Sequence, residues 1–172
     1  MKRSCLAACL VALIAWPITA RAEHAKIDLK VIHLNPDSGA EGDEAAAAIA
    51  DTEPPQGGGN ERPLAKVKVG EPLVLRFLLT NTYPHGVKKD VTVRYYVVRE
   101  EKQGQKNVPD LKTGTVTEGR FKMNFKPNCR VGARVVFKIT EPGIYLLRVE
   151  TVNTDSDHEH FSAIDVQAEK EP

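Results

Sequence analysis

The stretch FKMNFK, residues 121–126, decides the fold class of this chain. Phe121, Met123 and Phe125 alternate there with a lysine, an asparagine and a second lysine. Successive side chains of a β-strand point to opposite faces of a sheet, so this alternation predicts a strand with one buried face. The same period of two returns in residues 131–139, which predicts a second strand directly after the first.

Segments of the same kind occupy most of the chain on both sides of this pair. They are separated by Gly, Pro, Asn and Asp, and a helical period is almost absent. The chain is therefore expected to be all-β, an antiparallel β-sandwich of about seven to eight strands. The remaining expected strands are residues 26–34, 64–69, 73–80, 91–99, 144–152 and 158–166. A first strand in 23–34, a sandwich over 64–168 and a tail at 169–172 complete the expected layout.

Residues 35–63 have a different composition. They carry seven acidic side chains against one arginine, Arg62, together with Pro54-Pro55 and three glycines at 57–59. Such a segment buries too little apolar surface to offset the entropy of ordering it. We expect a disordered acidic linker or insertion, with at most a helical turn through the alanines at 45–48. The alternative is that residues 26–34 do not dock on the sandwich.

The first residues have the pattern of an export signal. Lys2 and Arg3 precede an apolar run over residues 6–18, and ARA at 20–22 is a signal-peptidase site. We expect a signal peptide over 1–22 and an exported, periplasmic or secreted, protein with no transmembrane segment in its mature form. A rival interpretation, a lipidation site at Cys9, is disfavoured because that cysteine stands before most of the apolar run.

Cleavage after residue 22 changes the charge and the cysteine count. Loss of Lys2, Arg3 and Arg21 lowers the basic residues from 24 to 21 against 23 acidic ones, a net charge of −2. Nothing in that balance favours nucleic acid as a partner. Cys129 is then the single cysteine, so an intramolecular disulfide is excluded. We expect a buried thiol, with pairing between chains or a reactive thiolate beside Arg130 as the alternatives.

Two motifs resemble those of known domains. EPGIYLLRV, residues 141–149, looks like the turn into a late strand of immunoglobulin-like and fibronectin-type sandwiches, and GEPLVLRF, residues 70–77, resembles an early strand of bacterial Ig-like domains. The resemblance implies that Tyr145 hydrogen-bonds back across its corner. Leu147 stands where antibody domains have their second bridging cysteine. The chain also resembles small exported bacterial proteins of Ig-like type, which implies a role in binding or scaffolding.

The sharpest chemical candidate is NTDSDHEH, residues 153–160. His158 and His160 are two positions apart, so on an extended strand their side chains project from one face. Neutral imidazoles bind Cu, Zn and Ni well. The candidate metal ligands are His158, His160, Asp157 and His85, with His24 and His33 as further imidazoles.

Two alternatives to a transition-metal site stay open. The segment is equally typical of a polar hairpin tip, and the oxygen ligands of Asn153, Asp155, Asp157 and Glu159 offer a weaker calcium hypothesis. An uninterrupted strand would place both histidines on the side of the core. Either a bulge near Ser162 turns them outward, or they lie at the mouth of the core.

No catalytic motif occurs, so we expect no enzyme. The first functional hypothesis is a non-catalytic binding or structural module of the cell envelope, with an unidentified envelope or extracellular protein or polymer as its partner and no cofactor. The alternative is a periplasmic metal-binding protein using His158 and His160. A small hydrolase with converging carboxylates, drawn from Asp90, Asp110 and Asp165, or a redox protein using Cys129 comes third.

Overall fold

The computed structural model describes residues 25–50, 62–81, 87–152 and 159–170. Every regular element within these ranges is a strand. The strands are β1 (Ala25–Leu34), β2 (Glu41–Ala50), β3 (Leu64–Lys68), β4 (Pro72–Asn81), β5 (Lys88–Glu100), β6 (Thr115–Phe125), β7 (Arg130–Lys138), β8 (Gly143–Val152) and β9 (Glu159–Glu169). The expected all-β sandwich is confirmed, with nine described strands in place of seven or eight.

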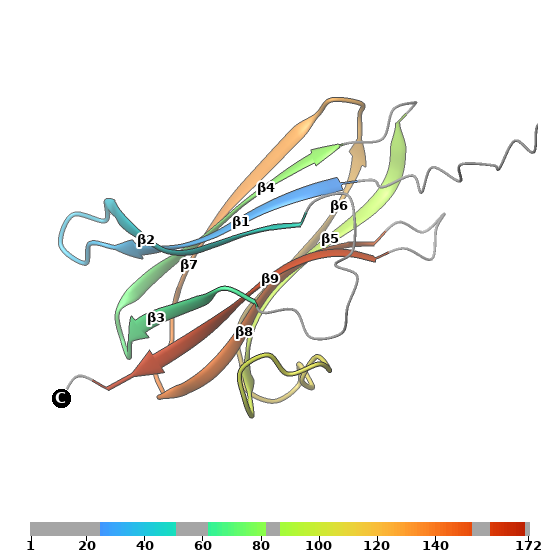
Figure 1. The fold of residues 1–172 in the computed structure, drawn as a ribbon. Coiled ribbons are helices and arrows are strands. Elements are labelled where there is room, and N and C mark those ends of the chain that lie inside the picture. The colour runs from blue at the N-terminus through green and yellow to red at the C-terminus, as the bar shows by residue number, and fades with distance from the viewer. Residues whose placement is uncertain (1–24, 51–61, 82–86, 153–158, 171–172) are drawn as a thin grey trace, which may run out of the picture.

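The strands form two layers (Figure 1). One is a four-stranded sheet in the order β2-β1-β4-β7, and the other is a five-stranded sheet in the order β3-β9-β8-β5-β6. Consecutive strands are adjacent in three places: β1 and β2 in the four-stranded sheet, and β5–β6 and β8–β9 in the five-stranded sheet. Most connections therefore cross between the layers.

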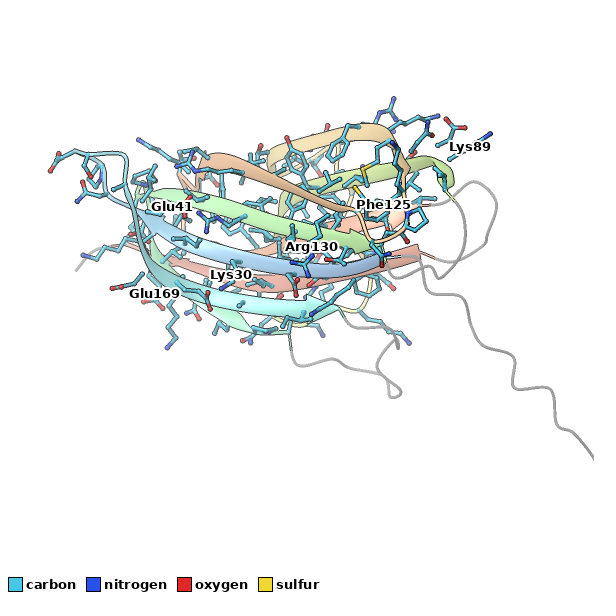
Figure 2. The ribbon with its side chains drawn as sticks, turned by 90° about the horizontal axis from the view of Figure 1, so that it is seen from above. Lys30, Glu41, Lys89, Phe125, Arg130 and Glu169 are labelled. Carbon is cyan, nitrogen blue, oxygen red and sulfur yellow. The ribbon has the colours of Figure 1, made fainter. Side chains whose placement is uncertain are left out.

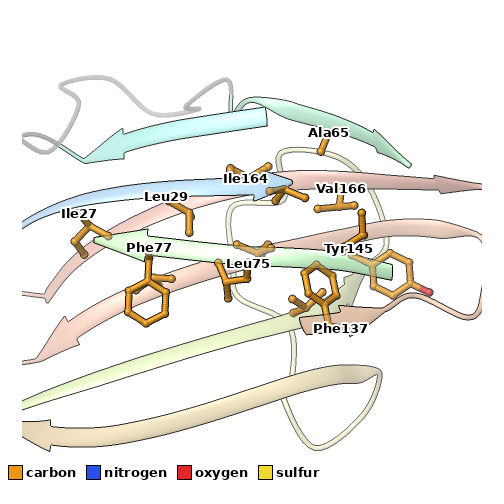
Figure 3. Packing of buried hydrophobic residues seen from close by; sticks show 14 of the residues in the cluster. Ile27, Leu29, Ala65, Leu75, Phe77, Phe137, Tyr145, Ile164 and Val166 are labelled. Atoms are coloured by element: carbon orange, nitrogen blue, oxygen red, sulfur yellow. The ribbon is translucent and has the colours of Figure 1, made fainter. Parts of the chain in front are cut away.

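The core fills the space between the two sheets (Figure 3). Ile27, Leu29 and Val31 of β1 are fully buried there, as the alternation in residues 26–34 predicts. β4 contributes Leu73, Leu75, Phe77 and Leu79, all with at most 1% of their surface exposed. Each such side chain contributes roughly 1.5–3 kcal/mol on burial.

The segment expected to be a disordered insertion contains strand β2, so that expectation is wrong for residues 41–50. A turn at Asn35 joins β1 to β2: its side-chain Oδ1 accepts hydrogen bonds from the backbone N–H groups of Asp37 and Ser38, both at 2.9 Å. Gly39 completes the turn at a φ of 67°. Residues 51–61 lie outside the described part of the chain.

Packing overrides composition in β2. Ala46 pairs with Val31, Ala48 with Leu29 and Ala50 with Ile27. The alanines at 46 and 48 pack against the core, where their short side chains let β2 approach β9 of the opposite sheet. No helical turn forms through 45–48, where the chain is extended, because the ladder with β1 and this burial outweigh a weak local helical preference.

One strand pair departs from the expected antiparallel arrangement. β3 runs parallel to β9, from Leu64 opposite Asp165 to Lys68 opposite Glu169. β3 buries Ala65 and Val67 against the core and is the last strand at this end of the five-stranded sheet. The sheet is consequently mixed rather than purely antiparallel.

The corner before β8 behaves as the resemblance implies. The hydroxyl of Tyr145 donates a hydrogen bond of 2.9 Å to the carbonyl oxygen of Glu141, four residues upstream. Burial raises the pKa of the Tyr145 hydroxyl, so it stays protonated and able to donate. The bond ties the loop between β7 and β8 to the start of β8.

A buried charge cluster joins three distant segments on the outer face of the five-stranded sheet. Arg62 donates to both carboxylate oxygens of Glu100, at 3.0 and 2.8 Å. Its Nε also lies 2.8 Å from Asp165 Oδ1, an ion pair in which the N–H does not point at that oxygen. The two carboxylates are 0% and 1% exposed, and the arginine is 13% exposed. Burial raises the pKa of both carboxyl groups, and Arg62 partly opposes that shift.

The loop over residues 101–114 covers this cluster. The N–H of Gly104 donates to Asp165 Oδ2 at 2.9 Å, and Leu111 packs on a small apolar cluster of β5, β8 and β9. The members of that cluster are Tyr96, Val98, Leu146 and Ala163. The outer face of the five-stranded sheet is thus partly closed by the chain itself.

Candidate functional site: the open side between β6 and β7

β6 and β7 form one side of the sandwich, and each is the last strand of its sheet. Among the described strands, β6 is hydrogen-bonded only to β5 and β7 only to β4. The two strands are joined by the turn at residues 126–129 but lie in different layers (Figure 1). Each therefore presents one backbone edge without a strand partner in the described part of the chain.

Although Phe125 of β6 and Phe137 of β7 are buried, five other core-facing side chains along this side are only half-buried. They belong to the alternating stretches that predict the fold, and they pack against the core without being covered. They are Phe121 and Met123 of β6 and Val131, Ala133 and Val135 of β7. On the opposite side, Ala65 and Val67 of β3 are buried and β2 contacts both β3 and β9. We call the β6–β7 side, with these five residues, the open side.

Tyr95 lies across the inner face of β6 at the open side. A Cβ atom at Gly119 would come within 2.3 Å of the Tyr95 hydroxyl oxygen, so only glycine leaves room for this ring. The ring also packs against Phe77, with centroids 5.9 Å apart and planes tilted by 42°. Gly119 therefore leaves room for the Tyr95 ring, and the buried Phe77 packs against that ring.

Asn81 holds the turn that carries the chain from β6 to β7. Its side-chain amide donates to the carbonyl oxygens of Phe125 and Lys126, at 3.0 and 2.8 Å, and its backbone N–H donates to Cys129 at 3.0 Å. Asn128 takes a φ of 57°, which asparagine tolerates better than most residues. Phe125 and Arg130, which flank the turn, lie at the same end of the sandwich (Figure 2).

Positive charge surrounds the open side. Residues 118–138 carry six cationic side chains and one acidic one, Glu118, and all seven are exposed. The cations are Arg120, Lys122, Lys126, Arg130, Arg134 and Lys138. Sheet edges often carry lysine and arginine to discourage aggregation, but such a row also attracts an anionic partner.

On the outer face of the four-stranded sheet, one carboxylate of the chain already pairs with two of its arginines. Glu41, at the start of β2, pairs with Arg76 of β4 and lies 2.9 Å from Arg134 Nε of β7. The hydrogen bond from Arg134, followed by the interactions with Arg76, holds the pKa of Glu41 below its ordinary value. The outer face of the four-stranded sheet thus binds a carboxylate within the chain.

Most of the predicted metal ligands lie outside the described residues: this is so for His85, Asp157, His158 and His24. His160 lies in β9, opposite Thr151 in a β8–β9 register without a shift. Of the two alternatives for this strand, the bulge near Ser162 does not occur, and position 160 keeps the register of Ile164 and Val166. His33 pairs with Leu73 at the far end of the sandwich, where its Nδ1 lies 3.4 Å from Glu71, so it is remote from position 160.

The other chemical candidates are not brought together. Within the described ranges, no group of three or more His, Cys, Asp or Glu side chains is placed to hold a metal ion. Asp90 and Asp110 are exposed, and Asp165 is engaged with Arg62. Cys129 is half-buried beside the core, with its Sγ 3.9 Å from the carbonyl oxygen of Arg130, so the expectation of a fully buried thiol is only partly met.

The chain matches no family model and no curated protein. Among solved structures, the PmoD soluble domain from Methylocystis sp. (strain Rockwell) is similar at a TM-score of 0.46 and 10% identity, over 83% of this chain and 90% of that chain. A family 123 glycoside hydrolase from Clostridium perfringens, described for glycolipid glycan hydrolysis, is similar at a TM-score of 0.41 and 12% identity. That match covers 63% of this chain but only 23% of the hydrolase. Neither likeness assigns a function.

Proposed function

We propose that this protein is an exported, non-catalytic binding module of the cell envelope, built on an Ig-like sandwich, that engages a macromolecule through its open side. One observation carries the proposal: five core-facing side chains of β6 and β7 are only half-buried beside two edges that lack a strand partner among the described residues. The backbone groups of an unpaired edge can hydrogen-bond to an added strand, and covering partly exposed apolar side chains makes the free energy of binding more favourable.

Export is supported by the sequence of the first residues. The basic start, the apolar run over 6–18 and the small-residue site at 20–22 have the order that a signal peptide requires. No helix in the described part of the chain is long and apolar enough to span a membrane.

Photo-crosslinking tests whether the open side binds a partner. A photoreactive residue replaces Val136, which lies on β7 and is 47% exposed, in the full chain in its own cells. Val108, in the loop over 101–114, is 41% exposed and gives a matched control. We expect a discrete adduct from position 136 and none from position 108. Adducts from neither position, or from position 108 alone, would contradict the proposal.

A second candidate function, metal binding through the histidines, is favoured by the topology. The described residues on either side of the segments 82–86 and 153–158 lie at the same end of the sandwich. Lys88 pairs with Phe125, which accepts the hydrogen bond from Asn81, and Val152 pairs with Thr92 nearby. The described residues that flank the segments carrying His85 and His158 therefore lie at the end of the sandwich where β9 begins.

Metal titration tests this candidate. Cu, Zn and Ni are each added after chelation to the wild type and to a His158→Ala/His160→Ala variant. Stoichiometric binding that raises the melting temperature only where both histidines are present is the expected result, through linkage of binding to folding. His33→Ala, at the far end, is the control and should behave as wild type. Equal melting of all three proteins with every ion would exclude the metal function.

A further inference from the structure

The free edge of β7 is the more regular of the two edges at the open side. β7 pairs with β4 at nine consecutive positions, from Pro72 opposite Lys138 to Thr80 opposite Arg130. The pairing of β6 with β5 contains two register shifts, which bend a strand and increase its twist. An incoming strand therefore finds the straighter template on β7.

The two faces of β7 differ sharply in chemistry. On the core side, the half-buried Val131, Ala133 and Val135 leave apolar surface exposed, with the half-buried Phe121 and Met123 on the neighbouring edge. On the outer side the exposed positions include three cations, Arg130, Arg134 and Lys138. Because side chains alternate along a strand, a strand beside β7 would itself be apolar on one face and anionic on the other.

The chain shows that this outer face accepts carboxylates from another strand. Glu41 of β2 reaches Arg134 on β7 and Arg76 on β4. An acidic side chain on an added strand would meet Arg130 and Lys138, for which no ion pair is found among the described residues.

From these observations we infer that the edge of β7 takes up an extended peptide segment with alternating apolar and acidic residues, which becomes the fifth strand of the four-stranded sheet. This inference rests on the proposed function and specifies its partner. A second copy of the chain is a poorer occupant, because its acidic edge strand, β2, has two of its three acidic side chains already paired. Glu41 pairs with Arg76 and Arg134, and Glu44 lies 2.6 Å from Lys30.

Binding of short synthetic peptides tests the inference. The probe is a blocked, labelled nonapeptide of alternating glutamate and valine, followed by fluorescence anisotropy with the full chain. The first control has the same composition with all glutamates before all valines, and the second alternates lysine with valine. We expect only the alternating acidic peptide to bind, more weakly at high salt, with new hydrogen-exchange protection of the β7 amides.

Matched charge reversals locate the contact. Arg130→Glu/Lys138→Glu should weaken the acidic peptide about 5–10-fold or more, since two partly exposed attractions become repulsions. Lys106→Glu/Lys112→Glu changes the net charge equally, at exposed positions of the loop over 101–114, and should change affinity less than about twofold. Circular dichroism confirms that each variant is folded.

Three results would overturn the inference. They are equal binding of the lysine peptide, an undiminished affinity after reversal at 130 and 138, and no binding of any peptide. Self-association through β7, seen by sedimentation and abolished by the same reversal, would replace the peptide with a second copy. A crosslink from position 136 without peptide binding would leave the proposed function standing and reject only this occupant.

Discussion

Replacing Arg62 with methionine is expected to lower the free energy of unfolding by about 3–5 kcal/mol near neutral pH. The arginine is the cation between Glu100 and Asp165, whose side chains are at most 1% exposed. Its removal leaves two carboxylates buried side by side without a counter-charge. Urea unfolding followed by circular dichroism measures the loss, and Lys66→Met, at an exposed position of β3, is the control expected to change stability by less than about 0.5 kcal/mol.

The pH dependence of that loss identifies its cause. Burial raises the pKa of Glu100 and of Asp165, so the folded protein binds these protons more tightly than the unfolded chain. Their contribution to stability is complete below the ordinary carboxyl pKa and is lost as pH rises through the raised values. Without Arg62 both values rise further, so the difference between variant and wild type should shrink towards about pH 5. An equal difference at both pH values would show that lost packing, not charge, is responsible.

A chain that begins at Arg62 is expected not to fold. It lacks β1, whose Ile27, Leu29 and Val31 are fully buried and whose backbone pairs with β4 along nine positions. Burial of these three side chains, at roughly 1.5–3 kcal/mol each, approaches the whole stability of a typical domain, roughly 5–15 kcal/mol. Proton NMR dispersion and cooperative urea unfolding provide the measurement.

A chain that begins at Ala25 keeps every described strand and should unfold cooperatively. The pair of truncations therefore tests whether the first strand belongs to the sandwich or is an appendage. A folded chain from Arg62 would show that residues 62–170 form an independent unit and that β1 only covers it.

Strand faces were predictable because a period of two directly reports burial. The alternation in residues 73–80 identified Leu73, Leu75 and Phe77 as core, and they are buried. The resemblance of the EPGIY corner likewise implied that Tyr145 hydrogen-bonds back across it, and the structure shows the acceptor to be the carbonyl oxygen of Glu141. Both features are local, so they need no knowledge of which strands are neighbours.

Strand β2 was missed because its composition carries no strand signal. Glutamate, aspartate, glycine and alanine are all poor strand formers, and what stabilises β2 is the partner strand and the core beneath it. A usable signal did precede it: Asn35-Pro36-Asp37-Ser38-Gly39 is typical of a tight turn after a strand. A turn there would have predicted that the chain doubles back alongside β1.

The open side could not be predicted, because alternation reveals faces and not neighbours. Phe121 and Val135 have the same pattern as the fully buried Leu75, and only the sheet order shows that they lie at edges. The row of cations from Arg120 to Lys138 was visible in the sequence. It indicates a basic sheet edge only once β7 is known to be the last strand of its sheet.

The parallel pairing of β3 with β9 affects when the protein can finish folding. Leu64 meets Asp165, so the pair closes a loop of about one hundred residues and must wait for nearly the whole polypeptide. Until β9 is present, β3 has no neighbouring strand in its sheet, so the five-stranded layer cannot be completed. The last strand of the chain therefore decides when this layer can form.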